Sequence, residues 1–142
     1  MTIKQALKHK NKLVKKIGEA FKKVYTYNTV LSGQTRPYDV VDSMNEYFKL
    51  SQELVELKTK IHKANQPVYD KIFLLSELKS QATKLDILDC SEGEVSDRYH
   101  EKTQVKTSAI SIVERDKIIA NIEEQIESIQ EELDIHNSTT QI

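Results

Sequence analysis

The chain has 142 residues, of which 38% are hydrophobic and 30% charged, with a net charge of −1. This length fits a single domain, and only three glycines and two prolines favour long helices. One cysteine, Cys90, excludes an internal disulfide and a cysteine-based zinc site within one chain. No apolar run reaches the roughly 18 residues of a membrane helix. The lysine-rich start lacks the apolar core of a secretory signal, so we expect a cytoplasmic protein.

The spacing of apolar residues predicts a first helix over residues 2–32. Thr2 and Gln5 form a capping box, and Gly33 suits a left-handed helix end. Steps of four and three alternate along a narrow seam that is typical of coiled-coil packing. Nine positions form this seam: Ile3, Leu7, Lys10, Val14, Ile17, Phe21, Val24, Asn28 and Leu31.

A second helix is expected over residues 38–65, because Pro67 pushes the residue before it out of the helical region. A flanking apolar row, Val41, Met44, Phe48 and Val55, widens its first half, so this helix needs at least two partners. Its seam has the same alternating spacing and contains Val40, Ser43, Tyr47, Leu50, Leu54, Leu57, Ile61 and Ala64.

The second half of the chain predicts two more helices, over residues 70–89 and 111–136. The third has two apolar faces, one with Leu74 and Leu78 and one with Leu75 and Ala82. The polar residues 90–110 are expected to be irregular, and the extended tendency around residues 103–109 is too weak to assign a strand. The last helix starts at a capping box and has the seam Ile112, Arg115, Ile119, Ile122, Ile126, Ile129, Leu133 and His136.

These helices predict an all-α fold, in which long antiparallel helices pack as one bundle with coiled-coil-like seams. A single narrow helix is marginal in water, so the helices must pack together. We also expect the bundle to assemble into a symmetric homo-oligomer.

Charge is distributed very unevenly along the chain. The first helix and its exit loop hold nine basic residues against one acidic residue, a net charge of +8. The last helix holds eight acidic residues against two basic ones, a net charge of −6. The two helices could neutralise each other within one chain or between chains. Alternatively, the basic helix could bind nucleic acid or an anionic membrane.

The motifs of the common enzyme and metal classes are absent. The glycines are isolated, so neither a Walker loop nor a dinucleotide fingerprint is present, and the histidines lie in separate segments. Cys90 has no base near it in sequence that could activate it as a nucleophile. We therefore expect no enzymatic activity, no metal and no cofactor.

One loop, residues 32–39, suits an anionic ligand. Arg36 could bind a phosphate or carboxylate near a helix N-terminus while Tyr38 stacks on a base. The same residues also make an ordinary capped turn, in which Arg36 pairs with an acidic side chain. Arg115 interrupts a seam, which indicates a buried ion pair or a polar pocket. The candidate ligand-binding residues are therefore Arg36, Tyr38, Arg115 and Arg98.

Several short motifs resemble the septicolysin-like family of small bacterial and phage proteins. They start with Ala6-Leu7 before a lysine-rich helix and continue with Tyr27-Asn28, Ser32-Gly33, Arg36-Pro37-Tyr38-Asp39, Leu57-Lys58, Glu77-Leu78-Lys79, Ile129-Gln130 and Leu133-Asp134. Many family members end in Asn-Trp, where this chain has Asn137-Ser138. The resemblance implies a helical protein that forms a symmetric oligomer, and it brings no catalytic residues.

Three functions follow as hypotheses. The first is a non-enzymatic, oligomeric helical protein that sequesters a small anionic or nucleotide-like ligand between subunits. The second is a structural or adaptor protein that acts through helix–helix association. The third is nucleic-acid binding through the basic first helix, and it would show as binding that falls steeply with salt.

Overall fold

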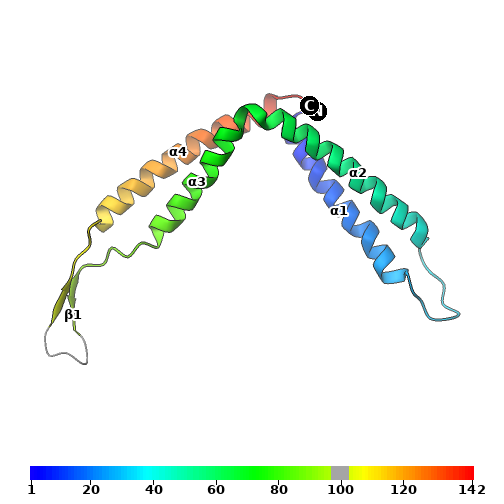
Figure 1. Cartoon of the computed structure of the whole chain (residues 1–142), viewed down its shortest axis with the longest axis horizontal. Helices are drawn as coiled ribbons and strands as arrows, with labels where there is room; N and C mark the ends of the chain where they lie inside the picture. Colours follow the sequence, from blue (N-terminus) through cyan, green and yellow to red (C-terminus); the bar gives the residue numbers. More distant parts are fainter. Residues whose placement is uncertain (97–102) are drawn as a thin grey trace. The chain divides into compact units, whose positions relative to one another are not determined.

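A computed structural model describes residues 1–96 and 103–142 and is mostly helical (Figure 1). The helical content confirms the main feature of the predicted all-α class. The helices are α1 (Ile3–Tyr27), α2 (Val40–Asn65), α3 (Tyr69–Asp86) and α4 (Ile112–Thr139), with a 3₁₀ turn at Gln66–Val68. Two short strands, β1 (Gly93–Val95) and β2 (Gln104–Lys106), form a small sheet. The chain divides into two compact units: unit 1 holds residues 1–67 and 135–142, and unit 2 holds residues 68–134.

The helix α1 starts where the sequence predicts and ends earlier. At its start the capping box is present: the Gln5 amide donates to Thr2 Oγ1 at 3.2 Å, and the Thr2 amide donates to Gln5 Oε1 at 2.9 Å. The predicted end at residue 32 is wrong, because the helix stops at Tyr27. Gly33 does have a positive φ of 86°, but it lies in the loop beyond the helix end.

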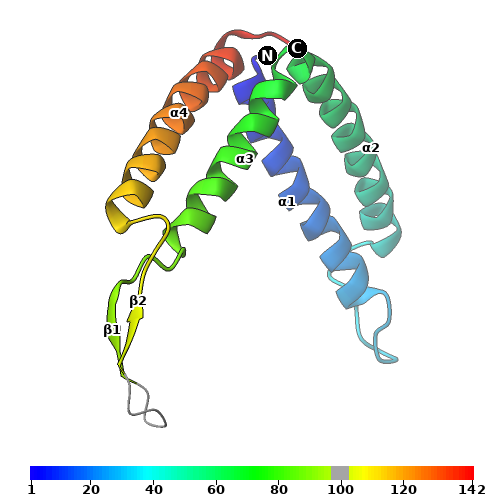
Figure 2. The ribbon, with the colours of Figure 1, turned by 60° about the vertical axis from the view of Figure 1, so that its left-hand side comes forward.

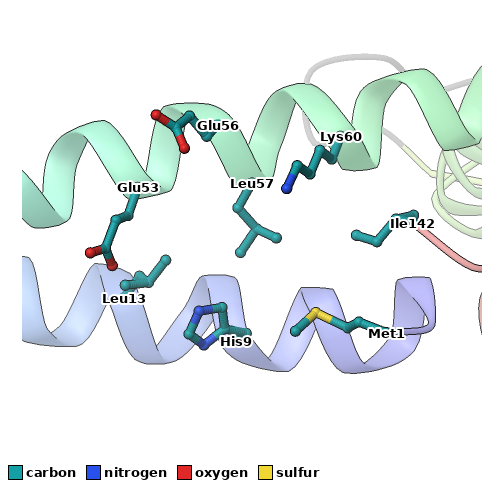
Figure 3. Close-up of a pocket in the computed structure, with 8 residues that line it drawn as sticks. All are labelled: Met1, His9, Leu13, Glu53, Glu56, Leu57, Lys60 and Ile142. Carbon is teal, nitrogen blue, oxygen red and sulfur yellow. The ribbon is translucent and has the colours of Figure 1, made fainter.

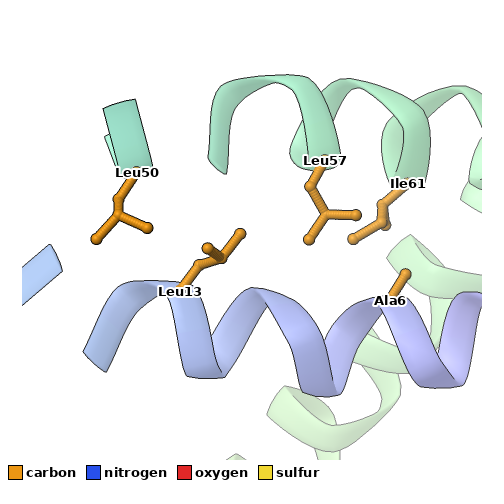
Figure 4. Close-up of a cluster of buried hydrophobic side chains, with 5 residues drawn as sticks. All are labelled: Ala6, Leu13, Leu50, Leu57 and Ile61. Atoms are coloured by element: carbon orange, nitrogen blue, oxygen red, sulfur yellow. The ribbon is translucent and has the colours of Figure 1, made fainter. Parts of the chain in front are cut away.

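The core of unit 1 lies between α1 and α2, whose backbones run close together. Figure 4 shows side chains from both helices pointing into this space. Alanines at positions 6 and 20 of α1 keep the helices close, because a methyl group needs little room between two backbones. The buried residues of the two helices are Ile3, Ala6, Leu13, Ala20, Val24, Leu50, Leu57 and Ile61.

The buried row of α1 differs from the predicted seam at every second position. The structure buries Ala6, Leu13 and Ala20, whereas the predicted seam used the residues that follow them, Leu7, Val14 and Phe21. Val14 is 51% exposed and Phe21 is 45% exposed. Of the apolar residues that the sequence assigns to the core of α1, Val14 and Phe21 are therefore on the surface, while Ile3 and Val24 are buried and Leu7 and Ile17 pack partly against the core.

The remaining part of unit 1 is the end of the chain, which packs against its start. The Ile3 amide donates to the Thr140 carbonyl at 3.1 Å, and the Ile142 amide donates to the Met1 carbonyl at 2.9 Å. These bonds hold the two termini side by side (Figure 1). Ile3 is fully buried there, and Ile142 packs against the α1–α2 core.

In unit 2, α3 and α4 are joined by side-chain contacts (Figure 2). Leu75 and Leu78 of α3 and Ile122 of α4 are buried, and an ion pair joins Lys71 to Glu132. The hydrogen bond and the charge of Glu132 raise the pKa of Lys71. The buried residues of α3 come from both of its predicted faces. This helix ends at Asp86 instead of residue 89, and α4 extends to Thr139 instead of residue 136.

Strands β1 and β2 lie in the segment that the sequence predicts to be irregular (Figure 2). They pair antiparallel, with Gly93 opposite Lys106. Side chains add to this pairing: Lys106 Nζ of β2 donates to Asp89 Oδ2 at 2.6 Å, and beyond the strands Ser108 Oγ donates to Glu92 Oε1 at 2.6 Å. The hydrogen bond from Lys106, followed by those from Ser91, holds the pKa of Asp89 well below its usual range.

Candidate functional site

Arg36 caps the C-terminal end of α1. Its Nε donates to the Tyr27 carbonyl at 2.9 Å, and its Nη2 donates to the Asn28 carbonyl at 3.0 Å. Carbonyls at the end of a helix lack partners within the helix, and a guanidinium fork can satisfy two of them at once. Two N–H donors of Arg36 that could bind a phosphate are therefore already bonded to main-chain carbonyls. Arg36 makes a capped turn, as the alternative reading allowed, but its acceptors are main-chain carbonyls instead of a carboxylate.

Tyr38 lies on the other side of the same turn and contacts α1. Its ring centre is 5.7 Å from that of Tyr27, and Lys23 Nζ lies 4.4 Å from the centre of the Tyr38 ring. A hollow of about 320 Å³ is lined there by Glu19, Lys22, Lys23, Thr26, Tyr27 and Tyr38. A second hollow, with Arg36 in its wall, lies beside it. The structure thus brings Arg36 and Tyr38 to one turn, and the lysines at Tyr38 were missed by the sequence analysis.

The other two candidate residues do not join this turn. Arg115 is partly buried in unit 2, where it bonds Asp116 Oδ1 at 3.1 Å and donates to the Leu88 carbonyl at 3.2 Å. The sequence predicts a buried ion pair or a polar pocket here, whereas the carboxylate that Arg115 contacts belongs to the next residue and is 61% exposed. Arg98 lies outside the described residues, so its predicted role is not addressed by the structure.

A metal site is not found within residues 1–96 and 103–142, where no group of His, Cys, Asp and Glu side chains converges as ligands would. Cys90 is buried and unpaired. His136 lies on the partly buried side of α4, and its Nδ1 is 3.1 Å from Thr140 Oγ1. In the same described ranges, no helix is long and apolar enough to cross a membrane.

One side of the α1–α2 hairpin is strongly charged. His9 of α1 and Glu53 and Lys60 of α2 line a hollow of about 340 Å³, which the side chains of Met1 and Ile142 close at one end. In Figure 3, Glu53 and Lys60 point toward α1 while Glu56 points away from it. The side of the hairpin that faces away from these charged residues is the other surface that the two helices share.

The opposite side of the hairpin is apolar. Each row of a helix repeats about every seven residues, so the row that follows the buried one on α1 is Leu7, Val14 and Phe21. The aromatic rings show that this row meets the matching side of α2, since Phe21 is 5.3 Å from Tyr47, which is 5.5 Å from Phe48. We define the apolar side as Leu7, Asn11, Val14, Gly18, Phe21, Tyr25, Val41, Met44, Phe48, Ser51 and Val55.

None of these eleven residues carries a charge, although 30% of the chain does. Several are well exposed, among them Tyr25 at 81%, Val41 at 69% and Phe48 at 61%. Scattered single apolar residues on a surface are ordinary, but a continuous patch of this kind is typical of a protein–protein contact. The sequence analysis found half of this patch, as the flanking row of the second helix.

The borders of the apolar side differ on the two helices. On α1 the next row outward is Lys8, Lys15 and Lys22, all exposed. On α2 the next row outward is Asn45, Gln52 and Thr59, which is polar but uncharged. An apolar centre with a polar rim is the usual anatomy of a protein interface.

Comparison with known proteins finds no family model, no curated protein and no solved structure with significant similarity to the chain. The resemblance to the septicolysin-like family therefore stays a prediction from the short motifs.

Proposed function

We propose that this protein is a non-enzymatic helical protein that acts through helix–helix association, forming a homo-oligomer. The observation that carries the proposal is the uncharged, aromatic-rich side of the α1–α2 hairpin. Each of these helices has two adjacent apolar rows; the hairpin buries one of them and covers the other only in part, since Leu7 and Met44 are partly buried while Phe21 and Phe48 are exposed. A helix with a wide apolar stripe needs partners on more than one side.

Burial of this side would supply the energy of association. Removing apolar surface from water contributes about 25 cal/mol per Å², and aromatic side chains contribute most because they are large. Phe21, Tyr25 and Phe48 are all at least 45% exposed in the single chain. Three exposed aromatics within one uncharged patch match the centre of an interface, where such residues are enriched.

The test is the dependence of thermal stability on protein concentration. Association of folded chains raises the melting temperature as concentration increases, so the wild type should melt higher at higher concentration. Phe48→Glu places a charge in the apolar side and should remove this dependence. Lys49→Glu, one residue away and off the apolar side, is the matched control and should retain it. A wild-type melting temperature that does not change with concentration would contradict the proposal.

A second candidate function is the binding of an anionic, nucleotide-like ligand, and the lysines around Tyr38 favour it. Lys22 and Lys23 supply positive charge, and Tyr27 and Tyr38 supply ring surface in the hollow that they share. ATP is a suitable probe because it has both a base and phosphates. Lys23→Gln should abolish the rise in melting temperature that ATP produces, while Lys12→Gln, elsewhere on α1, should preserve it. Equal ATP-induced rises in both variants would exclude this hollow as the site.

A further inference from the structure

We infer that the partner on the apolar side is a second copy of the same side, arranged so that α1 of one copy lies over α2 of the other. This inference rests on the proposed function and adds the occupant, its orientation and its register. Area, charge and the position of Gly18 support it separately.

The area that the apolar side offers is close to what a dimer needs. Its most exposed side chains are Val14, Phe21, Tyr25, Val41, Phe48 and Val55. With aromatic side chains of about 150–250 Å² and smaller valines, their exposed fractions leave roughly 600 Å². A standard interface buries about 800 Å² per partner, so these six side chains and their neighbours supply most of that area.

The charges on the borders decide the orientation. If α1 lay over α1 of the second copy, the two rows of Lys8, Lys15 and Lys22 would lie near each other. Like charges close together across an interface are unfavourable. If α1 lies over α2 of the second copy, each lysine row instead meets the uncharged row of Asn45, Gln52 and Thr59. The two lysine rows then occupy opposite corners of a four-helix bundle.

Gly18 fits this orientation as a recess in the apolar side. It is exposed in the middle of α1, where glycine costs about 1 kcal/mol relative to alanine, and a Cβ there would meet no heavy atom within 4 Å. Within one hairpin Phe21 lies level with Tyr47, so Gly18 lies within about half a turn of Phe48 along the axis. A two-fold axis parallel to the helices preserves these levels. It therefore brings Phe48 of the second copy to the recess at Gly18.

The experiment is cross-linking between two different single-cysteine variants in a Cys90→Ser background. One chain carries Tyr25→Cys and the other Val41→Cys, which lie on the same level and leave Gly18 and Phe48 intact. We expect a cross-linked heterodimer from this mixture under a short bismaleimide. The mixture of Gly18→Cys with Phe48→Cys should give the same product, and Gly18→Cys alone should give none.

The outcomes separate this inference from the proposed function. A Gly18→Cys chain that cross-links to itself would place α1 over α1 and overturn the orientation. Absence of both mixed products, with concentration-dependent melting retained, would show that the chain associates through another surface or partner arrangement. Loss of concentration-dependent melting in the wild type would overturn the proposed function itself, and the inference with it.

Discussion

The guanidinium of Arg36 caps the end of α1. Eight residues downstream of Asn28, it returns to donate to two carbonyls at the end of the helix. The local pattern of the sequence favours a longer helix, because apolar spacing continues to Leu31 and Gly33 follows it. A contact between residues eight and nine positions apart leaves no periodic trace, so the sequence could not show it.

Arg36→Ala should lower the melting temperature by a few degrees, because it leaves two carbonyls with only water as a partner. Hydrogen bonds of this kind contribute about 1 kcal/mol each in exposed positions. Arg36→Lys keeps the charge but cannot donate to two carbonyls at once as the guanidinium does. Its melting temperature should lie between those of the wild type and Arg36→Ala. Thermal melting at low protein concentration measures this. An unchanged melting temperature in Arg36→Ala would argue against the capping role.

Asp89 ties the loop after α3 to β2 through Lys106. Because the folded protein lowers the pKa of Asp89, this carboxylate stabilises the fold above its ordinary pKa of about 3.8. The contribution is lost as the pH falls below that value and through the folded pKa. The strand pair should therefore be insensitive to pH near neutrality and weaken only in acid.

Lys106→Ala should raise the pKa of Asp89 toward its ordinary value, because the Lys106 hydrogen bond is the largest cause of the lowering. A carboxyl titration followed by nuclear magnetic resonance measures the pKa directly. Lys79→Ala, which removes a lysine elsewhere in unit 2, should leave it unchanged. If the pKa of Asp89 stayed low in Lys106→Ala, the ion pair would not be its cause.

At the scale of elements, α1 shows why helix existence was easier to predict than helix orientation. The buried row and the predicted seam share Ile3 and Val24, and Ile17 of the seam is partly buried against the core. The larger side chains favoured the row with Leu7, Val14 and Phe21. Packing favours the alanines instead, because they let α1 approach α2. Periodicity alone cannot decide between two adjacent apolar rows of one helix.

Substitutions at Leu13 and Val14 test whether the observed buried row or the predicted seam forms the core of α1. Leu13→Ala should destabilise the isolated chain by about 2–3 kcal/mol, because it leaves a cavity in the core between α1 and α2. Val14→Ala should cost less than about 1 kcal/mol, since Val14 is half exposed. Urea unfolding at the lowest practical protein concentration gives both values. If Val14→Ala lowered the free energy of unfolding more than Leu13→Ala, the predicted seam and not the observed row would form the core.

The strand pair shows what element prediction misses. β1 and β2 have three residues each, and all six are exposed, so no alternation of buried and exposed positions marks them. They are instead joined by polar pairs, Asp89 with Lys106 and Glu92 with Ser108, which are 17 and 16 residues apart. Such pairs become visible only in three dimensions. The long helices, whose caps and spacing are local, could be predicted from the sequence.

At the scale of the whole molecule, the chain divides into two compact helical units, and each has buried apolar residues of its own. In unit 1 the basic helix α1 packs on α2, whose own charges balance. Only part of the apolar side, the candidate association surface, could be predicted from the sequence. The flanking row of α2 was visible in the sequence, but the matching row of α1 had been assigned to the core.

Sedimentation velocity of the wild-type chain and of Phe48→Glu tests the central claim most directly, because it measures mass in solution. The chain has a mass of 16.4 kDa. We expect the wild type at micromolar concentration to sediment as a species of twice that mass, and Phe48→Glu to sediment at the mass of one chain with its helical content retained. A wild-type chain that stays monomeric across the concentration range would contradict the claim that the apolar side is covered by a second copy.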